Sequence, residues 1–198
     1  MSYSLTRTSG PLVEPVSVAE AKAHLRVDGD DDNLYIAGLV SAAREWVESY
    51  LDRTLVHTQW TLRLETLGDE IELPRPPMAT SAGQTAVSVT YTLESGETAT
   101  LATQTYRVDR NSTPGEITPV YGQTWPAHRI DDNSVSVTWW AGYGGSGADV
   151  PAAIRHAMLM LVAFWYDNRS AVLVGSVSKP LEFAVESLLS SQKWGGYK

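Results

Sequence analysis

Apolar residues recur at helical spacing near the start of the chain. Ser17 is followed three residues later by Glu20, which is the pattern of a capping box at a helix start. Three apolar residues of the segment 17–26 fall on one helix face, namely Val18, Ala21 and Leu25. The pattern therefore predicts a short helix over 17–26.

A longer helical pattern follows the acidic run 28–32. Its apolar residues are again spaced by three and four, at Ile36, Leu39, Val40, Ala43, Val47, Tyr50 and Leu51. Asp31 or Asp32 is placed to cap the first turn, where carboxylates also favour the positive end of the helix dipole. These positions predict a long amphipathic helix that ends near Asp52.

The period changes to two in the middle of the chain. Apolar and polar residues alternate in short runs that include 60–65, 87–93 and 135–139, with Gly- and Pro-containing turns between the runs. Alternation of this kind indicates strands with one buried and one open face. We expect a small antiparallel β unit between about residues 55 and 141.

Helical spacing returns after the glycine run 142–147. The segment 150–166 is apolar on two faces, which is typical of a helix buried in a core or against a neighbouring subunit. A last amphipathic helix is predicted near 181–189. The tail that follows holds Trp194 and Tyr197, and it either docks these aromatic rings elsewhere or folds back on its own domain.

These periods predict an α+β fold that is mainly α. We expect a helical bundle with an antiparallel β insertion between the second and third long helices. The expected parts are an N-terminal helical part (1–54), the β insertion (55–141), a helical part that completes the bundle (142–179) and a C-terminal helix with its tail (180–198).

The amino-acid composition argues against several classes of function. The 198 residues include 23 Asp and Glu against 15 Lys and Arg, for a net charge of −8. This balance argues against nucleic-acid binding through counterion release and against docking on anionic lipid. The absence of cysteine excludes disulfides, a thiolate nucleophile and a cysteine zinc site. The longest apolar-rich run, 157–166, is about ten residues, half of what a membrane span needs.

One glycine motif resembles a cofactor signature. Gly142, Gly144 and Gly147 match G-x-G-x-x-G between a predicted strand and a predicted helix. However, Gly147 precedes Pro151 and so lies outside the helix, and the alternating strands are unlike those of a parallel dinucleotide-binding sheet. We interpret the motif as a hinge rather than a cofactor site.

The remaining chemistry-bearing residues predict no catalytic or metal centre. Counted from Asp28, an EF-hand would need Gly and Glu where the chain has Asn33 and Leu39. The four histidines have no partner at helical spacing, and no nucleophile–base pair stands out. We expect a protein that is not an enzyme and binds no cofactor.

Seven tryptophans are many for this length. Trp139 and Trp140 point to opposite faces of one predicted strand, so only one of them can fill the core. Trp125 and Tyr143 lie near the same end of the β unit. The cluster favours core and protein contacts, and the alternative is a carbohydrate-binding or adhesion module that uses the aromatic β unit.

The order of several segments resembles a known family. The chain is similar to the head–tail connector, or neck adaptor, proteins of long-tailed bacteriophages, which also occur in prophages and gene transfer particles. The matching segments are 18–27, 42–55, 59–62, 71–77, 106–109, 117–119, 125–126, 135–144, 150–157 and 165–169.

This resemblance implies a structural role without catalysis. It implies packed helices with a β insertion, and a ring of twelve subunits beneath the portal that extends the DNA channel. DNA would pass through without specific binding, and a stopper or tail-terminator protein would dock below. The protein would be assembled in the host cytoplasm and end in the virion neck, with no membrane partner. We further expect the acids of 28–32, or Glu45 and Glu48, to face the channel.

The same resemblance implies contact residues. Members of the family commonly reach the portal with the C-terminal segment, which here offers Leu181, Val185, Leu188, Leu189, Trp194 and Tyr197. The chain's own apolar faces, rather than the resemblance, suggest candidates for contact between ring subunits, namely Trp46, Trp140, Met160 and Phe164.

Overall fold

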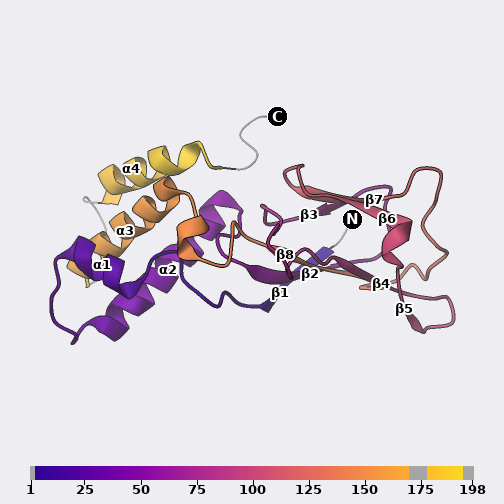
Figure 1. Ribbon diagram of the computed structural model, residues 1–198, viewed down its shortest axis with the longest axis horizontal. Coiled ribbons are helices and arrows are strands. Elements are labelled where there is room, and N and C mark those ends of the chain that lie inside the picture. Colours follow the sequence, from indigo (N-terminus) through magenta and orange to yellow (C-terminus); the bar gives the residue numbers. More distant parts are fainter. Residues whose placement is uncertain (1–2, 170–177, 194–198) are drawn as a thin grey trace. The chain divides into compact units, whose positions relative to one another are not determined.

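The computed structural model describes residues 3–169 and 178–193. The chain forms two compact units (Figure 1). The β unit comprises residues up to 12 together with 57–144, and the helical unit comprises 13–56 together with the chain from 145 onward. The backbone therefore passes from one unit to the other three times.

The larger sheet of the β unit has five antiparallel strands. Their order is β1 (Tyr3–Ser9), β2 (Thr58–Leu64), β8 (Val135–Ala141), β4 (Ser88–Thr92) and β5 (Thr98–Thr100). The central strand β8 buries Val135, Val137, Trp139 and Ala141 and leaves the residues between them half-buried. The predicted alternation is thus confirmed for this strand, with Trp139 in the core and Trp140 on the other face.

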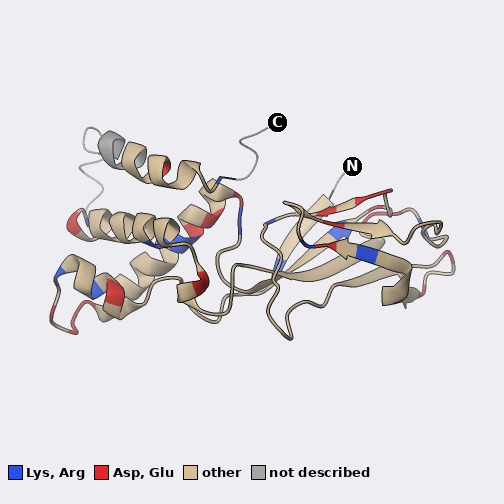
Figure 2. Ribbon diagram, turned by 45° about the horizontal axis from the view of Figure 1, so that its top comes forward, with Lys and Arg blue, Asp and Glu red and all other residues tan. Residues whose placement is uncertain are grey.

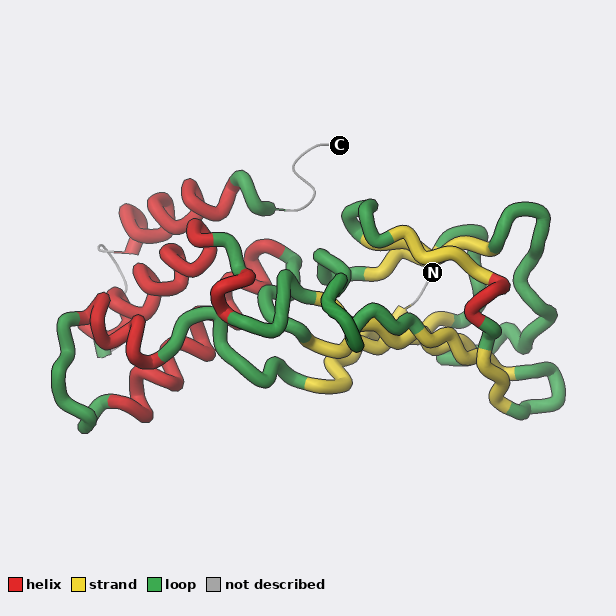
Figure 3. The backbone as a smooth tube through the Cα atoms, viewed as in Figure 1, coloured by secondary structure: helices red, strands yellow, loops and turns green. Residues whose placement is uncertain are grey.

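A smaller sheet covers the inner face of the larger one (Figure 3). It consists of β3 (Ile71–Leu73), β7 (Gly115–Pro119) and β6 (Tyr106–Asp109), and a 3₁₀ turn, η1 (Thr103–Thr105), precedes β6. Residues of both sheets form one hydrophobic cluster that includes Trp139 and Ile117. The β unit therefore has its own core between two layers.

The helical unit packs four helices together. These are α1 (Val18–Leu25), α2 (Asn33–Leu51), α3 (Ala152–Asp167) and α4 (Ser178–Ser190), with a 3₁₀ turn, η2 (Gly147–Asp149), before α3. The helix α3 contacts the other three, which explains its two apolar faces. Ser17 and Glu20 form the predicted capping box of α1, and α2 ends at Leu51 as its pattern predicts.

The expectation of a mainly helical bundle is wrong. Helices make up 32% of the chain and strands 25%, and the sheets are antiparallel. A strand also occupies Tyr3–Ser9, where the sequence interpretation placed a helical part. Most residues of β1 are exposed, because the strand lies at a sheet edge, so the period-two signal that marks half-buried strands is weak there.

A buried ion-pair network ties the connecting segments to α2. Arg44 donates to a carboxylate oxygen of Glu14 at 2.8 Å and to one of Glu48 at 2.9 Å. Glu48 also accepts the backbone N–H of Leu55 at 3.0 Å, and Ser41 donates to Glu14 at 2.7 Å. Burial lowers the pKa of Arg44, but the two carboxylates outweigh it and leave this pKa above its ordinary value. Arg44 therefore stays charged and holds residues on both sides of α2.

Gly147 lies against the segment that leads into α1. A Cβ atom at this position would sit 2.6 Å from the carbonyl oxygen of Pro15 and 2.9 Å from that of Glu14. Arg155 of α3 donates to the same Pro15 carbonyl at 3.1 Å. Because the obstacles are backbone atoms, only glycine fits without moving the chain.

We predict opposite effects for two glycine-to-alanine changes. Gly147→Ala should lower the free energy of unfolding by about 1–3 kcal/mol, since a methyl group is forced into packed backbone. Gly38→Ala, at an exposed position in α2 with nothing within 4 Å of the added Cβ, should raise it by roughly 0.5–1 kcal/mol. Chemical denaturation of both variants measures this, and equal effects would contradict the account.

The buried network predicts that removing Arg44 causes a large loss of stability, which a second substitution partly restores. Arg44→Ala should cost about 3–5 kcal/mol of unfolding free energy, because it leaves the carboxylate of Glu48 buried without its cation. Adding Glu48→Gln, which keeps the acceptor for the Leu55 N–H, should recover part of the loss. The exposed pair Arg129–Asp131, at 2.8 Å, is the matched control: Arg129→Ala should cost at most about 1 kcal/mol.

Candidate interaction surfaces

Hydroxyl side chains cover most of the outer face of the five-stranded sheet. The strand register places Thr6 beside Thr61, Thr61 beside Thr138, and Thr138 beside Ser88, and directly paired residues share a face. The other members of this hydroxyl face are Ser4, Thr8, Thr90, Thr92, Thr98, Thr100 and Ser136. The face also carries Gln59, Arg63 and Trp140 but no carboxylate at any of these positions.

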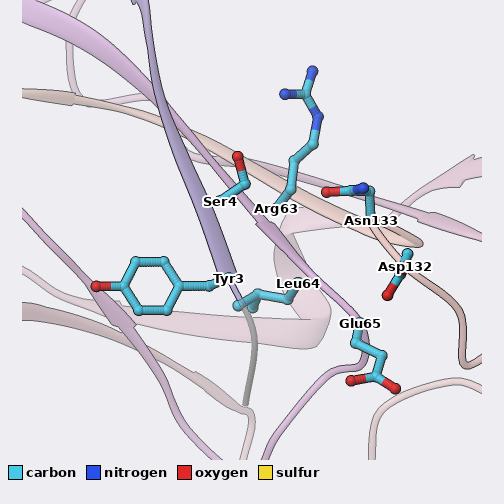
Figure 4. A pocket seen from close by; sticks show the side chains of 7 residues that line it. All are labelled: Tyr3, Ser4, Arg63, Leu64, Glu65, Asp132 and Asn133. Atoms are coloured by element: carbon cyan, nitrogen blue, oxygen red, sulfur yellow. The ribbon is translucent and has the colours of Figure 1, made fainter.

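A pocket of about 200 Å³ lies at one border of the hydroxyl face. Figure 4 shows Arg63, Ser4 and Asn133 on one side of it, with Glu65 and Asp132 directed to the other. The Arg63 guanidinium donates to the hydroxyl of Thr6 at 3.5 Å. Because both signs of charge line the pocket, its electrostatics select neither an anion nor a cation.

An acidic row crosses the outer face of the smaller sheet. Glu116 on β7 is paired with Glu72 on β3 and with Asp109 on β6 (acidic residues are red in Figure 2). Burial, and then the carboxylates of Glu70, Asp109 and Glu72, hold the pKa of Glu116 above its ordinary value. Like charges directly opposite one another destabilise a sheet, so this row costs stability that the β unit gains elsewhere.

Two of the predicted portal-contact residues lie inside the helical unit. Val185 and Leu189 of α4 are 0% exposed, and Leu188 is half-buried. The side chain of Leu181 and the residues Trp194 and Tyr197 lie outside the described part of the structure. While α4 keeps this position, its Val185–Leu189 stripe is not open to another protein.

The helix α4 instead exposes a residue that sequence reasoning missed. Phe183 is 75% exposed, on the side away from Val185. It was overlooked because it breaks the apolar stripe of the amphipathic pattern. The sequence could have identified Phe183, because a large aromatic residue on the polar side of a surface helix is unusual. Phenylalanine also occurs only twice in the chain.

The last described residues are held at the C-terminal end of α2 and just beyond it. Arg53 donates to the carbonyl of Gln192 at 2.7 Å, and the ammonium of Lys193 lies 4.7 Å from the centre of the Tyr50 ring. Tyr50 in turn stacks on Trp46, with 5.3 Å between ring centres and planes 3° apart. This cluster therefore fixes the position of Gln192 and Lys193.

The candidates for subunit contact are all partly accessible. Trp46 on α2, Met160 and Phe164 on α3, and Trp140 on β8 are each half-buried. Trp46, Met160 and Phe164 belong to the helical unit, whereas Trp140 is on the hydroxyl face of the β unit. The four residues therefore do not form one patch within a single unit.

The acidic run 28–32 is partly neutralised. Asp32 occupies the N-cap position of α2 but makes no capping hydrogen bond with its side chain. Instead it accepts hydrogen bonds from Tyr166 and from Arg169, the latter at 2.8 Å. These two bonds, in that order, lower the pKa of Asp32. Asp30 pairs with Lys22 at 2.8 Å, whereas the side chains of Asp28 and Asp31 are exposed to solvent.

The glycine motif lies where the sequence argument placed it. Gly147 begins η2, and α3 starts only at Ala152, while the preceding strand β8 pairs antiparallel with both neighbours. Within residues 3–169 and 178–193, no cluster of three or more His, Asp or Glu side chains is arranged to hold a metal ion. Over the same residues no helix is both long and apolar enough to span a membrane.

The acidic row predicts that removing one of its carboxylates stabilises the protein in a pH-dependent way. A carboxyl whose pKa is raised by folding opposes folding when ionised, so its cost is present at neutral pH and vanishes below the pKa of the unfolded chain. Glu116→Gln should therefore raise Tm at pH 7, and the gain should disappear below about pH 4. Adding Glu116→Gln to a Glu72→Gln variant should bring a smaller gain; a gain independent of pH and of Glu72 would contradict the account.

Comparison with known proteins supports one family. Residues 15–107 match the family described as phage gp6-like head-tail connector protein. A search of curated proteins finds no match to the chain.

Solved structures share the fold over nearly the whole length. A chain in the neck of an empty gene transfer agent particle, computed with C6 symmetry, aligns with TM-score 0.77 and 20% identity over 96% of this chain and 95% of its own. A chain in the virion of a native particle aligns with TM-score 0.74 and 21% identity over 96% and 94%. A chain in the neck of a native particle, computed with C12 symmetry, aligns with TM-score 0.71 and 19% identity over 96% of this chain and 94% of its own. The resemblance to phage head–tail connectors is therefore confirmed: residues 15–107 match that family, and the fold found in gene transfer agent particles extends over 96% of the chain.

Proposed function

We propose that the protein is a structural head–tail connector in the neck of a phage or gene transfer particle. The single observation that carries this is the family match over residues 15–107, joined to a fold shared over 96% of the chain with proteins of gene transfer agent necks. We further propose a ring of twelve subunits beneath the portal, which extends the DNA channel and receives the next neck or tail component. The C12 symmetry of one matching neck supports that number.

Exposed apolar side chains support a protein that works in an assembly. Leu34 is 90% exposed, Tyr121 98%, and Phe183 75%. Large side chains of this kind gain free energy when a partner removes them from water, by roughly 25 cal/mol per Å² of apolar surface. Together with the half-buried Trp46 and Phe164, they offer contact points on both units.

We propose that the portal is reached through the tail and the open side of α4, not through the buried stripe. The contacts of Arg53 and Lys193 hold the last described residues at the end of α2, and Trp194 and Tyr197 follow them in the sequence. Phe183 adds an accessible aromatic ring on the neighbouring helix. Val185 and Leu189 then serve to hold α4 on α3.

Only acidic side chains that are exposed to solvent are candidates for lining the DNA channel. Glu48 is buried in its pair with Arg44, so it belongs to the interior of the helical unit and the expectation that it faces DNA is wrong. Glu45 is 63% exposed at its side chain, and Asp28 and Asp31 are exposed. We propose these three as the acids that repel a passing duplex and keep it from adhering.

The decisive experiment mixes the protein with the portal encoded nearby and images the product. The intact chain should form a twelvefold ring on the portal. A chain ending at Lys193 should keep its Tm but lose the ring or bind the portal at least about tenfold more weakly, and Phe183→Ser should weaken binding in the same direction.

The matched control is Leu189→Ala, in the buried stripe. It should cost about 2–5 kcal/mol of unfolding free energy, while leaving portal binding intact at temperatures where the variant remains folded. No binding of the intact chain would overturn the connector role. Binding that survives in both the truncated chain and Phe183→Ser would keep that role and move the anchor elsewhere.

A further inference from the structure

A second pocket, of about 330 Å³, opens at the edge of the β unit. It lies between the β4–β5 hairpin, the turn that contains η1, and the segment 123–126. The lining residues are Tyr91, Thr100, Leu101, Ala102, Thr105, Gln123, Thr124, Trp125 and Pro126. Aromatic rings, hydroxyls and one side-chain amide line it, and none of these nine residues is a carboxylate or a cation.

The aromatic wall of this pocket is held in place. The indole N–H of Trp125 donates to the carbonyl of Gly68 at 2.6 Å, and the ring packs against the core of the β unit. Nε2 of His128 accepts the N–H of Leu67 at 3.2 Å, and its Nδ1 lies 2.9 Å from the carbonyl of Pro126. The segment that carries Trp125 is therefore fastened at two points, and the ring needs no reordering on binding.

Polar groups surround the aromatic wall. The Thr105 hydroxyl donates to the carbonyl of Ala102 at 2.7 Å, which leaves its oxygen able to accept a hydrogen bond. Gln123 and Thr124 are exposed and supply a donor and acceptors at the rim. The pocket thus combines apolar ring faces with several neutral hydrogen-bonding groups.

This combination selects one ligand class. A nucleotide, a metal ion or a charged peptide would lose its hydration here with no opposite charge to replace it. A pyranose ring presents an apolar C–H face and a rim of hydroxyls, which match an aromatic wall bordered by threonine and glutamine. The volume lies at the lower end of the range of about 300–1,000 Å³ for small-molecule sites, which suits a single sugar ring. We propose that this pocket binds one residue of a neutral saccharide, a function separate from the connector role.

The test titrates the full-length protein with glucose, galactose, mannose and N-acetylglucosamine in the millimolar range. Binding is followed by tryptophan fluorescence and by ligand-observed NMR, with sialic acid as the charged comparison. At least one neutral sugar should bind. Gln123→Ala and Thr105→Val should each weaken that binding about two- to tenfold, the effect of one lost neutral hydrogen bond.

The matched control is Tyr121→Ala, which removes a fully exposed ring from the same segment but not from the pocket. It should leave the affinity unchanged. The proposal is overturned if no neutral sugar binds, if sialic acid binds as well as the neutral sugars, or if Gln123→Ala and Thr105→Val have no effect. A proline-rich peptide that binds in place of every sugar would overturn it too. None of these results depends on ring formation, so the connector role is tested separately.

Discussion

The helical unit depends on one buried guanidinium. Arg44 sits in the middle of α2 with its side chain 5% exposed, and it reaches Glu14 before α1 and Glu48 on its own helix. Glu48 holds the backbone at Leu55, beyond the end of α2. Taking these charges out of water is costly unless each finds its partners. The segments that enter and leave the helical unit near Glu14 and Leu55 are therefore held in place by this network.

The need for this network follows from the connectivity. The backbone leaves or re-enters the helical unit at three places, near residues 12, 56 and 144. Segments at such crossings lack the regular hydrogen bonds of helices and need other partners. Arg44 holds the side chain of Glu14 near the first crossing, and Glu48 accepts the N–H of Leu55 near the second. The close contact of Gly147 with Pro15 packs the third crossing against the first.

Sequence periodicity predicted the elements that bury one face. The capping box at Ser17, the length of α2 and the alternation along β8 all follow from local patterns, and the structure bears them out. The edge strand β1 escaped prediction because little of it is buried. The balance between helix and strand was misjudged for a related reason, since short strands separated by long turns leave weaker periodic signals than helices do.

The interaction residues were harder to predict than the elements. An amphipathic stripe such as Val185 and Leu189 has the same pattern whether it packs on a partner or on its own unit, and only the structure distinguishes the two. The Arg44 network was missed for the opposite reason. Arg44 and Glu48 have the i,i+4 spacing of an ordinary surface pair, and local patterns do not register a distant partner such as Glu14.

Whether an apolar stripe packs inside its own unit or on a partner also decides how α4 can contribute to binding. An apolar stripe that stabilises the helical unit cannot also bind a partner unless the helix leaves its place, which would expose that stripe to water. Contact through Phe183 avoids this cost, because that side chain is already 75% exposed. In the proposed connector role, docking through Phe183 on the open side of α4 leaves the helical unit intact on assembly.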